Sequence, residues 1–137
     1  MYSFSDFETV RALPAVVSVK DIADAIGMSA TRTYEIIDEQ KIPYMRVGKR
    51  IIIFKEHLLQ GLSKKGIFTD VAELCAIREL PKIFSPKRLK DVLGISNGNA
   101  YTLVRTPGFP AVFERNRILI SKAELVRWIS EHECNKN

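Results

Sequence analysis

Hydrophobic and polar positions follow the same order twice along this chain. Residues 11–62 align without a gap on residues 78–129, an offset of 67 positions, and fifteen of the fifty-two pairs are identical. Many of the other pairs exchange one apolar residue for another. The identical pairs include turn residues as well as core residues: Pro14/Pro81, Gly27/Gly94, Tyr34/Tyr101, Pro43/Pro110 and Leu58/Leu125. The match predicts two copies of one small fold, at residues 1–66 and 67–137.

A short first helix is expected in each copy. In the first copy, Ser5 and Glu8 have the spacing of a capping box, which predicts a helix over about residues 6–13. In the second copy, the helix is expected to begin at residue 69 or 70. Its apolar residues recur at every third position and form one face: Val71, Leu74 and Ile77.

Two further helices, separated by a glycine, are predicted next. Ser18 precedes a helix over residues 19–26 and Ser29 precedes one over residues 30–40, because a hydroxyl there can accept a hydrogen bond from the first turn. Gly27 can take the left-handed conformation that ends a helix. The second copy repeats the order with Ser85-Pro86, Gly94 and Ser96. Helix, turn and helix within about 20 residues is the layout of a helix-turn-helix.

Runs of β-branched residues around a short turn predict a hairpin in each copy. The strands are expected at residues 44–47 and 51–54, and again at residues 111–113 and 118–120. A closing amphipathic helix follows each hairpin, at residues 55–62 and 121–132. The chain is therefore predicted to be α+β and mainly helical.

Composition narrows the class of protein. Of the 137 residues, 46% are hydrophobic and 27% are charged, as in an ordinary soluble globule. No apolar run approaches the roughly 20 residues that span a bilayer, and residues 1–10 lack a basic segment, so we expect a cytoplasmic protein with no membrane partner. Cys75 and Cys134 lack the spacing of a metal site and are expected to be reduced.

The chain lacks a constellation of residues for catalysis. His57 and His132 are isolated, there is no glycine-rich phosphate loop, and the acidic residues are spread over predicted helix surfaces. We therefore expect no enzyme activity, no metal and no cofactor. His57 is expected to pack on the closing helix or to contact solvent.

The net charge is +5, and the placement of the cations matters more than their number. Both hairpin turns are basic, and basic residues gather in two stretches: Arg46, Lys49, Arg50 and Lys55, and then Lys82, Lys87, Arg88 and Lys90. Cations on a hairpin beside a helix-turn-helix can contact phosphates or the minor groove. Small polar residues at the amino end of the third helix suit a helix that enters the major groove. An ordinary solvated helix face and an ordinary charged turn remain the alternatives.

The residues that carry a family likeness are residues 18–29, 34–37, 42–43 and 46–50, with Ile53. Together with the order of helix, helix-turn-helix, hairpin and closing helix, they resemble the excisionase/MerR-like winged helix-turn-helix family over nearly all of each repeat. The second copy departs from the pattern at residues 97–99 and 106–108 and in its longer turn. Tandem copies in one small protein also look like TraN-type accessory proteins of Gram-positive conjugative plasmids, which bind near a transfer origin.

This resemblance implies a role for each element on DNA. The third helix would lie in the major groove, the hairpin would lie as a wing in the adjacent minor groove, and the start of the second helix would contact the DNA backbone. In the first copy these roles fall to Thr31, Arg32, Tyr34 and Glu35, to Lys49 and Arg50, and to Lys20. In the second copy they fall to Asn97, Asn99, Tyr101, Thr102 and Arg105, to Arg115, Asn116 and Arg117, and to Lys87.

The expected function is sequence-specific binding of double-stranded DNA by a monomer whose two modules form an internal pseudo-dimer with an approximate twofold axis. Three roles stay open: a transfer-origin accessory factor that works with a relaxase, an excisionase that bends DNA for a recombinase, and a transcriptional repressor. An alternative of another class is a protein-interaction module whose second DNA face is vestigial. Gly98 and the pair Pro107-Gly108 favour that alternative.

Overall fold

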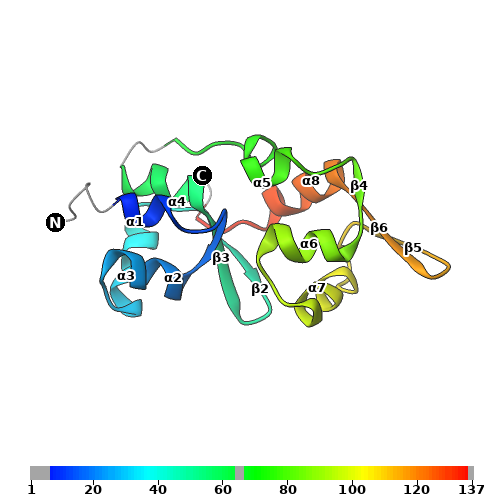
Figure 1. Cartoon of the computed structure of the whole chain (residues 1–137), viewed down its shortest axis with the longest axis horizontal. Helices are drawn as coiled ribbons and strands as arrows, with labels where there is room; N and C mark the ends of the chain where they lie inside the picture. Colours follow the sequence, from blue (N-terminus) through cyan, green and yellow to red (C-terminus); the bar gives the residue numbers. More distant parts are fainter. Residues whose placement is uncertain (1–6, 64–66, 136–137) are drawn as a thin grey trace. The chain divides into compact units, whose positions relative to one another are not determined.

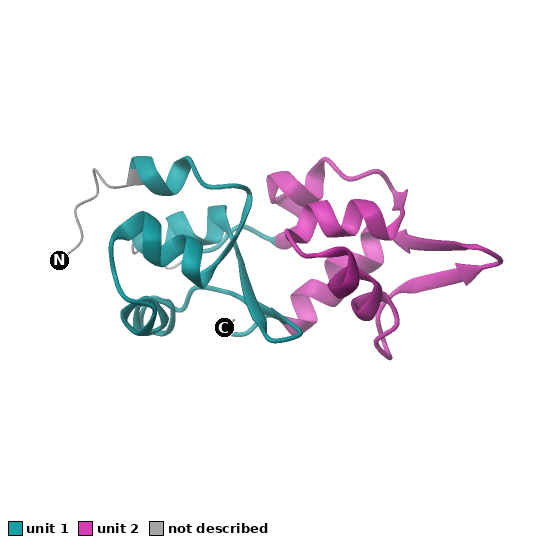
Figure 2. Ribbon diagram, turned by 60° about the horizontal axis from the view of Figure 1, so that its bottom comes forward, with its two compact units in different colours: residues 1–70, 133–137 teal, residues 71–132 magenta. Residues whose placement is uncertain are grey.

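The computed structural model describes residues 7–63 and 67–135. The chain divides into two compact units (Figure 1 and Figure 2). Unit 1 contains Met1–Asp70 and Glu133–Asn137, and unit 2 contains Val71–His132. The fold is α+β and about half helical, with one small three-stranded antiparallel sheet in each unit. Unit 1 thus includes residues 67–70 and 133–135, which the repeat alone assigns to the second copy.

In unit 1, three helices precede the hairpin and one follows it. The elements in order are α1 (Phe7–Arg11), β1 (Val16–Ser18), α2 (Val19–Ile26), α3 (Ala30–Glu39), β2 (Met45–Val47), β3 (Arg50–Phe54) and α4 (Lys55–Leu62). The sheet order is β1-β3-β2. Its inner face packs on α2, α3 and α4 through a core that includes Ile22, Ile36, Ile53 and Leu58.

Unit 2 repeats this order. Its elements are η2 (Val71–Glu73), α5 (Cys75–Arg78), β4 (Ile83–Phe84), α6 (Pro86–Leu93), α7 (Asn97–Val104), β5 (Ala111–Glu114), β6 (Arg117–Ser121) and α8 (Lys122–His132). The sheet order is β4-β6-β5, and the β5–β6 hairpin projects well beyond the helices of the unit (Figure 2). The bounds of α6 and β6 are those of α2 and β3 shifted by 67 positions.

Most of the predicted helix ends are confirmed by their hydrogen bonds; the exception is Ser85, whose side chain makes no cap hydrogen bond at the start of α6. Ser18 and Asp21 form a reciprocal capping box at 3.2 Å in each direction. Ser29 and Ser96 accept from the third residue of α3 and α7, both at 3.1 Å. Gly27 and Gly94 end α2 and α6 with φ of 70° and 63°. These caps fix the angle at which α3 and α7 leave the preceding turn. The capping box predicted at Ser5 lies outside the described residues.

Two features differ from the sequence-based expectation. Each hairpin gains a third strand, β1 or β4, which pairs antiparallel with β3 or β6. These strands are only three and two residues long, below the four to eight that a strand pattern needs. The single helix expected from residue 69 or 70 is divided into η2 and α5, because Leu74 takes an extended conformation with ψ of 138°.

Each unit has a lysine at the equivalent position whose ammonium group stabilises the fold. The Lys55 ammonium donates to the carbonyls of Arg11 and Leu13 at 2.9 and 2.8 Å. The equivalent Lys122 donates to the carbonyls of Arg78 and Leu80 at 2.8 and 3.2 Å. Both lysines satisfy carbonyls at the end of the first helix, where cations are favourable. Lys55 therefore serves the fold and is not one of the surface cations.

The segment 133–135 packs on unit 1. Tyr44 and Cys134 exchange two backbone hydrogen bonds, at 2.8 and 3.4 Å. The side-chain amide of Asn135 donates to the carbonyls of Ile37 and Ile42 at 3.3 and 3.2 Å. This segment therefore pairs with the backbone just before β2.

His57 is buried, with 2% of its surface exposed, and so does not contact solvent as one expectation allowed. Its Nε2 lies 2.7 Å from the Thr69 carbonyl oxygen, and its ring packs edge-on against Phe54 and Phe68. Its Nδ1 lies 3.7 Å from Oε2 of Glu133, beyond hydrogen-bonding distance. Burial lowers the pKa of this imidazole, and the Thr69 carbonyl and the Glu56 carboxylate act in the opposite direction.

Candidate nucleic-acid interface

A surface cleft of about 320 Å³ lies in unit 1 where three elements meet. The start of α2, the exposed side of α3 and the hairpin turn each contribute to it. Its lining residues are Ser18, Val19, Lys20, Tyr34, Lys49, Arg50 and Ile51. Four of the residues predicted to contact DNA are thus brought together: Lys20, Tyr34, Lys49 and Arg50.

Unit 2 has a cleft of about 340 Å³ at the same place in its fold. Its lining residues are Ser85, Pro86, Tyr101, Asn116, Arg117, Ile118 and Leu119. Six of these seven positions correspond to lining positions of the first cleft at the offset of 67. The repeat in the sequence is therefore also a repeat of one surface feature.

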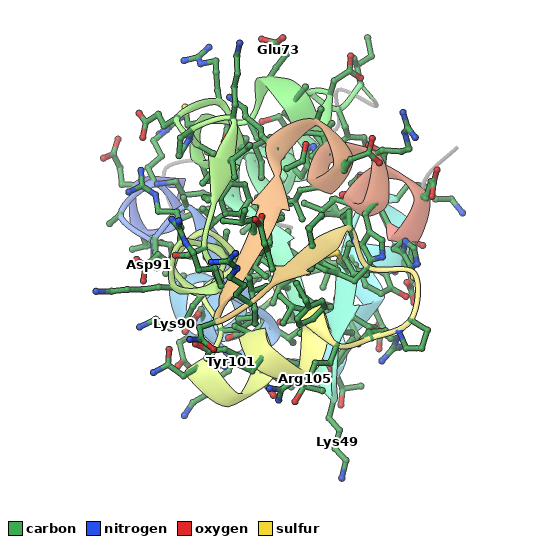
Figure 3. All side chains as sticks on the ribbon, turned by 90° about the vertical axis from the view of Figure 1, so that its right-hand side faces the viewer. Lys49, Glu73, Lys90, Asp91, Tyr101 and Arg105 are labelled. Atoms are coloured by element: carbon green, nitrogen blue, oxygen red, sulfur yellow. The ribbon has the colours of Figure 1, made fainter. Side chains whose placement is uncertain are left out.

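A tyrosine from the third helix stands in each cleft. Tyr34 and Tyr101 are 45% and 44% exposed, so their rings are half covered and their edges reach solvent. In unit 2, the Arg105 guanidinium carbon lies 5.9 Å from the ring centroid of Tyr101, and both side chains point outward from α7 (Figure 3). An exposed aromatic ring beside cations is a combination suited to a sugar-phosphate backbone.

The starts of α2 and α6 differ in charge. In α2 the Asp21 carboxylate closes the capping box, which places an anion at the helix N-terminus. In α6 the equivalent residue is Arg88, and the Ser85 side chain makes no cap hydrogen bond. Lys87 and Arg88 are both exposed. Because a helix N-terminus attracts anions, the start of α6 is the better place for a phosphate.

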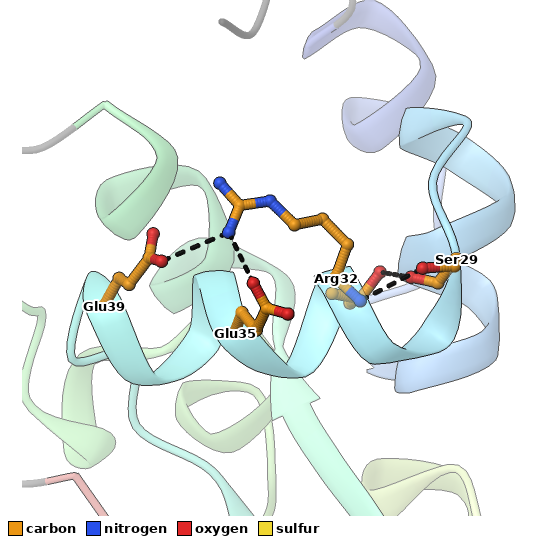
Figure 4. Close-up of polar contacts among 5 residues, drawn as sticks. Ser29, Arg32, Glu35 and Glu39 are labelled. Atoms are coloured by element: carbon orange, nitrogen blue, oxygen red, sulfur yellow. Dashed lines mark hydrogen bonds and ion pairs between the residues drawn. The ribbon is translucent and has the colours of Figure 1, made fainter.

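The exposed face of α3 is acidic. The Arg32 guanidinium, through Nη1, lies 2.8 Å from Oε2 of Glu35 and 3.1 Å from Oε1 of Glu39 (Figure 4). Asp38 adds a third exposed carboxylate to this helix. With their C-caps, α2 and α3 carry two basic and five acidic residues, a net charge of −3.

Unit 2 has the opposite balance on the equivalent helices. With their C-caps, α6 and α7 carry four basic residues and one acidic residue, a net charge of +3. The acidic residue is Asp91, whose Oδ1 lies 3.8 Å from the Lys90 ammonium; both side chains extend outward from α6 (Figure 3). The face predicted to approach DNA is therefore more positive on the helices of unit 2.

The hairpins differ at their turns. Residues 45–54 of unit 1 carry three cations and no acid, and residues 111–121 of unit 2 carry two cations and Glu114. Gly48, in the first turn, has φ of 62°, and the equivalent residue in the second turn is Arg115 with φ of 54°. A left-handed conformation costs a non-glycine residue roughly 1–2 kcal/mol, so Arg115 is held at a strained position on the hairpin turn.

Most of the predicted contact residues are on the surface. Fourteen of the sixteen are exposed, and Arg32 and Asn99 are half-buried. Seven of them line the two clefts, and the remaining nine lie outside the clefts on α3, α6, α7 and the second hairpin: Thr31, Arg32, Glu35, Lys87, Asn97, Asn99, Thr102, Arg105 and Arg115. The sequence reasoning missed seven lining residues, although six of them occupy equivalent positions in the repeat: Ser18, Val19, Ile51, Ser85, Pro86, Ile118 and Leu119.

Within residues 7–63 and 67–135, no group of three or more His, Cys, Asp or Glu side chains is placed to hold a metal ion. None of the helices described there has the length and apolar character needed to cross a bilayer. Comparison of the chain with protein-family models, with curated proteins and with solved structures gave no match in any of the three searches.

Proposed function

We propose that this chain binds double-stranded DNA and that each unit acts as a winged helix-turn-helix module. The observation that carries the proposal is the repeated cleft, in which the start of a helix, an exposed tyrosine and a hairpin arginine, Arg50 or Arg117, come together twice. A surface built twice from equivalent residues suits a partner that is itself repetitive. Duplex DNA repeats its grooves about every 34 Å.

In this proposal, α3 and α7 enter the major groove, and the β2–β3 and β5–β6 hairpins contact the minor groove or the backbone. The starts of α2 and α6 contact phosphates through Lys20 and Lys87. One chain occupies a single site of roughly 20 base pairs, with two half-sites separated by one turn of the duplex. The two units then act together as an internal pseudo-dimer, and no second chain is needed.

Unit 2 is proposed to supply most of the affinity for phosphate. The positive net charge of α6 and α7 supports this assignment. Arg115 also supports it, because an arginine occupies a left-handed position at which glycine would be free of strain. A vestigial second DNA face would be expected to have lost its cations. The surface of unit 2 is instead the more basic of the two on the helices, which favours DNA binding over the protein-interaction alternative.

The family resemblance extends the proposal to a biological role. It favours an accessory factor of a mobile element that binds at a transfer origin beside a relaxase. An excisionase that bends DNA for a recombinase and a transcriptional repressor would use the same surface. These roles differ in where the site lies, so isolation of bound fragments from genomic DNA separates them.

The binding proposal is tested by a mobility-shift titration with matched arginine variants. Arg117 lines the cleft of unit 2, whereas Arg127 lies on α8, outside both clefts. Arg117→Ala is expected to weaken duplex binding roughly tenfold at 0.1 M salt through loss of one phosphate contact. Arg127→Ala removes the same charge and is expected to change binding little. Equal effects of the two variants, or no binding to any duplex at low salt, would contradict the proposal.

A further inference from the structure

The third helices of the two units carry different polar pairs at equivalent positions. At the offset of 67, Arg32 corresponds to Asn99 and Glu35 corresponds to Thr102. Position 32 and position 99 are fixed in the same way, because each backbone N–H donates to the cap serine, Ser29 or Ser96, at 3.1 Å. The two pairs are therefore presented from the same place in each unit by the same local geometry.

The pair in unit 1 combines a donor and an acceptor. Arg32 Nη1 lies 2.8 Å from Glu35 Oε2, and the two side chains are 43% and 53% exposed (Figure 4). They stand one turn apart on the same face of α3, so they reach solvent side by side. Glu39, 3.1 Å from the same nitrogen, holds the guanidinium from the other direction.

The surroundings of Arg32 make it a poor contact for a phosphate. The carboxylates of Glu35, Asp38 and Glu39 outnumber it on the exposed face of α3. An approaching phosphate would meet three negative charges for one positive charge. The edge of a base pair carries no net charge and offers acceptors beside a donor, which complements a guanidinium beside a carboxylate.

The pair in unit 2 is neutral. Asn99 is half-buried at the third position of α7, and Thr102 is exposed one turn later. The Thr102 carbonyl accepts a hydrogen bond from the Thr106 hydroxyl at 3.0 Å, which supports the backbone at the end of this helix. An amide next to a methyl-bearing hydroxyl offers both hydrogen-bonding groups and an apolar contact.

We propose that the two units read different base pairs: Arg32 and Glu35 read a G·C pair, and Asn99 and Thr102 read an A·T pair. Arginine donates to guanine O6 and N7, and glutamate accepts from the cytosine N4 amino group. Asparagine donates to adenine N7 and accepts from its N6 amino group, and the threonine methyl contacts the thymine methyl. This inference rests on the proposed DNA binding and gives the binding site two half-sites of unlike composition.

The test is a selection of bound duplexes from a pool with about 20 randomised base pairs, a length that covers two half-sites one turn apart. The full-length protein is expected to enrich one half-site with a central G·C pair and the other with a central A·T pair. The double variant Arg32→Asn with Glu35→Thr places the pair of unit 2 in unit 1. It is expected to convert the G·C half-site to A·T. The ratio of its affinities for the A·T and G·C versions of that half-site is expected to change roughly 5- to 150-fold.

A matched control comes from α8. Arg127 and Glu124 form the same kind of pair, three residues apart and 3.6 Å from each other, outside both clefts. Arg127→Asn with Glu124→Thr is expected to leave the selected sequence unchanged. The reciprocal variant Asn99→Arg with Thr102→Glu is expected to convert the A·T half-site to G·C. Thermal unfolding of each variant confirms that the fold is retained.

The possible failures are distinct. If both half-sites have the same composition, or if the exchange in α3 leaves the selected sequence as it was, this inference is overturned while DNA binding stands. If no duplex is enriched and none is retarded at low salt, the proposed function is overturned, and the base assignment falls with it.

Discussion

Unit 1 and unit 2 share the order of their strands and of the helices from α2 and α6 onward, and they differ in where they carry charge. With their C-caps, α2 and α3 have a net charge of −3, and the first hairpin has a net charge of +3. With their C-caps, α6 and α7 have a net charge of +3, and the second hairpin has a net charge of +1. The backbone is held by caps, glycine turns and core residues that both units share. Surface residues do not take part in those interactions, so their charge can differ between the units. The positive charge lies mainly on the helices in unit 2 and on the hairpin in unit 1.

The sheets of the two units also differ in exposure. In unit 1, Met45 and Ile52 lie opposite each other and are 1% and 2% exposed. The equivalent residues in unit 2 are Val112, which is 61% exposed, and Leu119, which is half-buried. Phe113, next to Val112, is also exposed. The second hairpin therefore carries apolar surface into solvent next to its arginines.

The largest effect is expected where the helix starts differ. Lys87→Ala with Arg88→Ala should lower affinity for duplex DNA roughly 10- to 100-fold at 0.1 M salt, because two phosphate contacts are lost. Lys20→Ala in unit 1 should have a smaller effect, since Asp21 already opposes a phosphate there. Mobility-shift titrations over a range of salt concentrations measure both. If the variants of the two units behave alike, the charge comparison has no functional meaning.

An opposite change is expected from removal of the acids on α3. Asp38→Asn with Glu39→Gln should raise affinity for any duplex roughly fivefold, because two negative charges leave the face that is proposed to approach DNA. Glu124→Gln with Glu131→Gln removes two acids from α8 and serves as the control. Fluorescence anisotropy with random duplex measures the change. An equal gain for the control would show that net charge alone is responsible.

The shared turns should respond equally in the two units. Gly27→Ala and Gly94→Ala should each lower the free energy of unfolding by about 1 kcal/mol, because alanine is strained at φ of 70° or 63°. Gly98→Ala is the control. Gly98 lies in α7, and the hydroxyl oxygen of Ser96 would lie 3.9 Å from the added carbon, an ordinary contact distance, so a small gain in stability is expected. Urea denaturation measures all three. A stabilised Gly27→Ala variant would contradict the cap assignment.

The smallest effect concerns pH and should be confined to unit 1. Burial lowers the pKa of His57 below its ordinary value of 6.5. Above pH 6.5 the imidazole is neutral in both the folded and the unfolded chain. As the pH falls below 6.5, the unfolded chain takes up a proton that the folded chain resists, so stability declines until the folded pKa is passed. The equivalent residue in unit 2 is Glu124, which is exposed.

Urea denaturation at pH 7.5 and at pH 5.5 measures this decline. His57→Gln should reduce the difference between the two pH values, because glutamine does not titrate. An unchanged difference in the variant would assign the pH dependence to other groups.

Sequence patterns predicted the elements that are marked locally and missed those that depend on distant partners. The bounds of α2 are as expected, because Ser18 and Gly27 mark both ends. The strand β1 was missed, since its three residues form a strand only by pairing with β3, as Val17 does with Ile53. Arg32 and Glu35 were each predicted to face DNA, but the contact between them depends on rotamers that spacing does not specify. The charge difference between the units, by contrast, is fully visible in the sequence.

The return of residues 133–135 to unit 1 gives the chain an unusual order: unit 2 is inserted within unit 1. A stop codon placed after residue 70 would not release an intact first half, since it would also remove Cys134, the backbone hydrogen-bond partner of Tyr44. A half-length protein that keeps this partner needs a splice from residue 70 to residue 133.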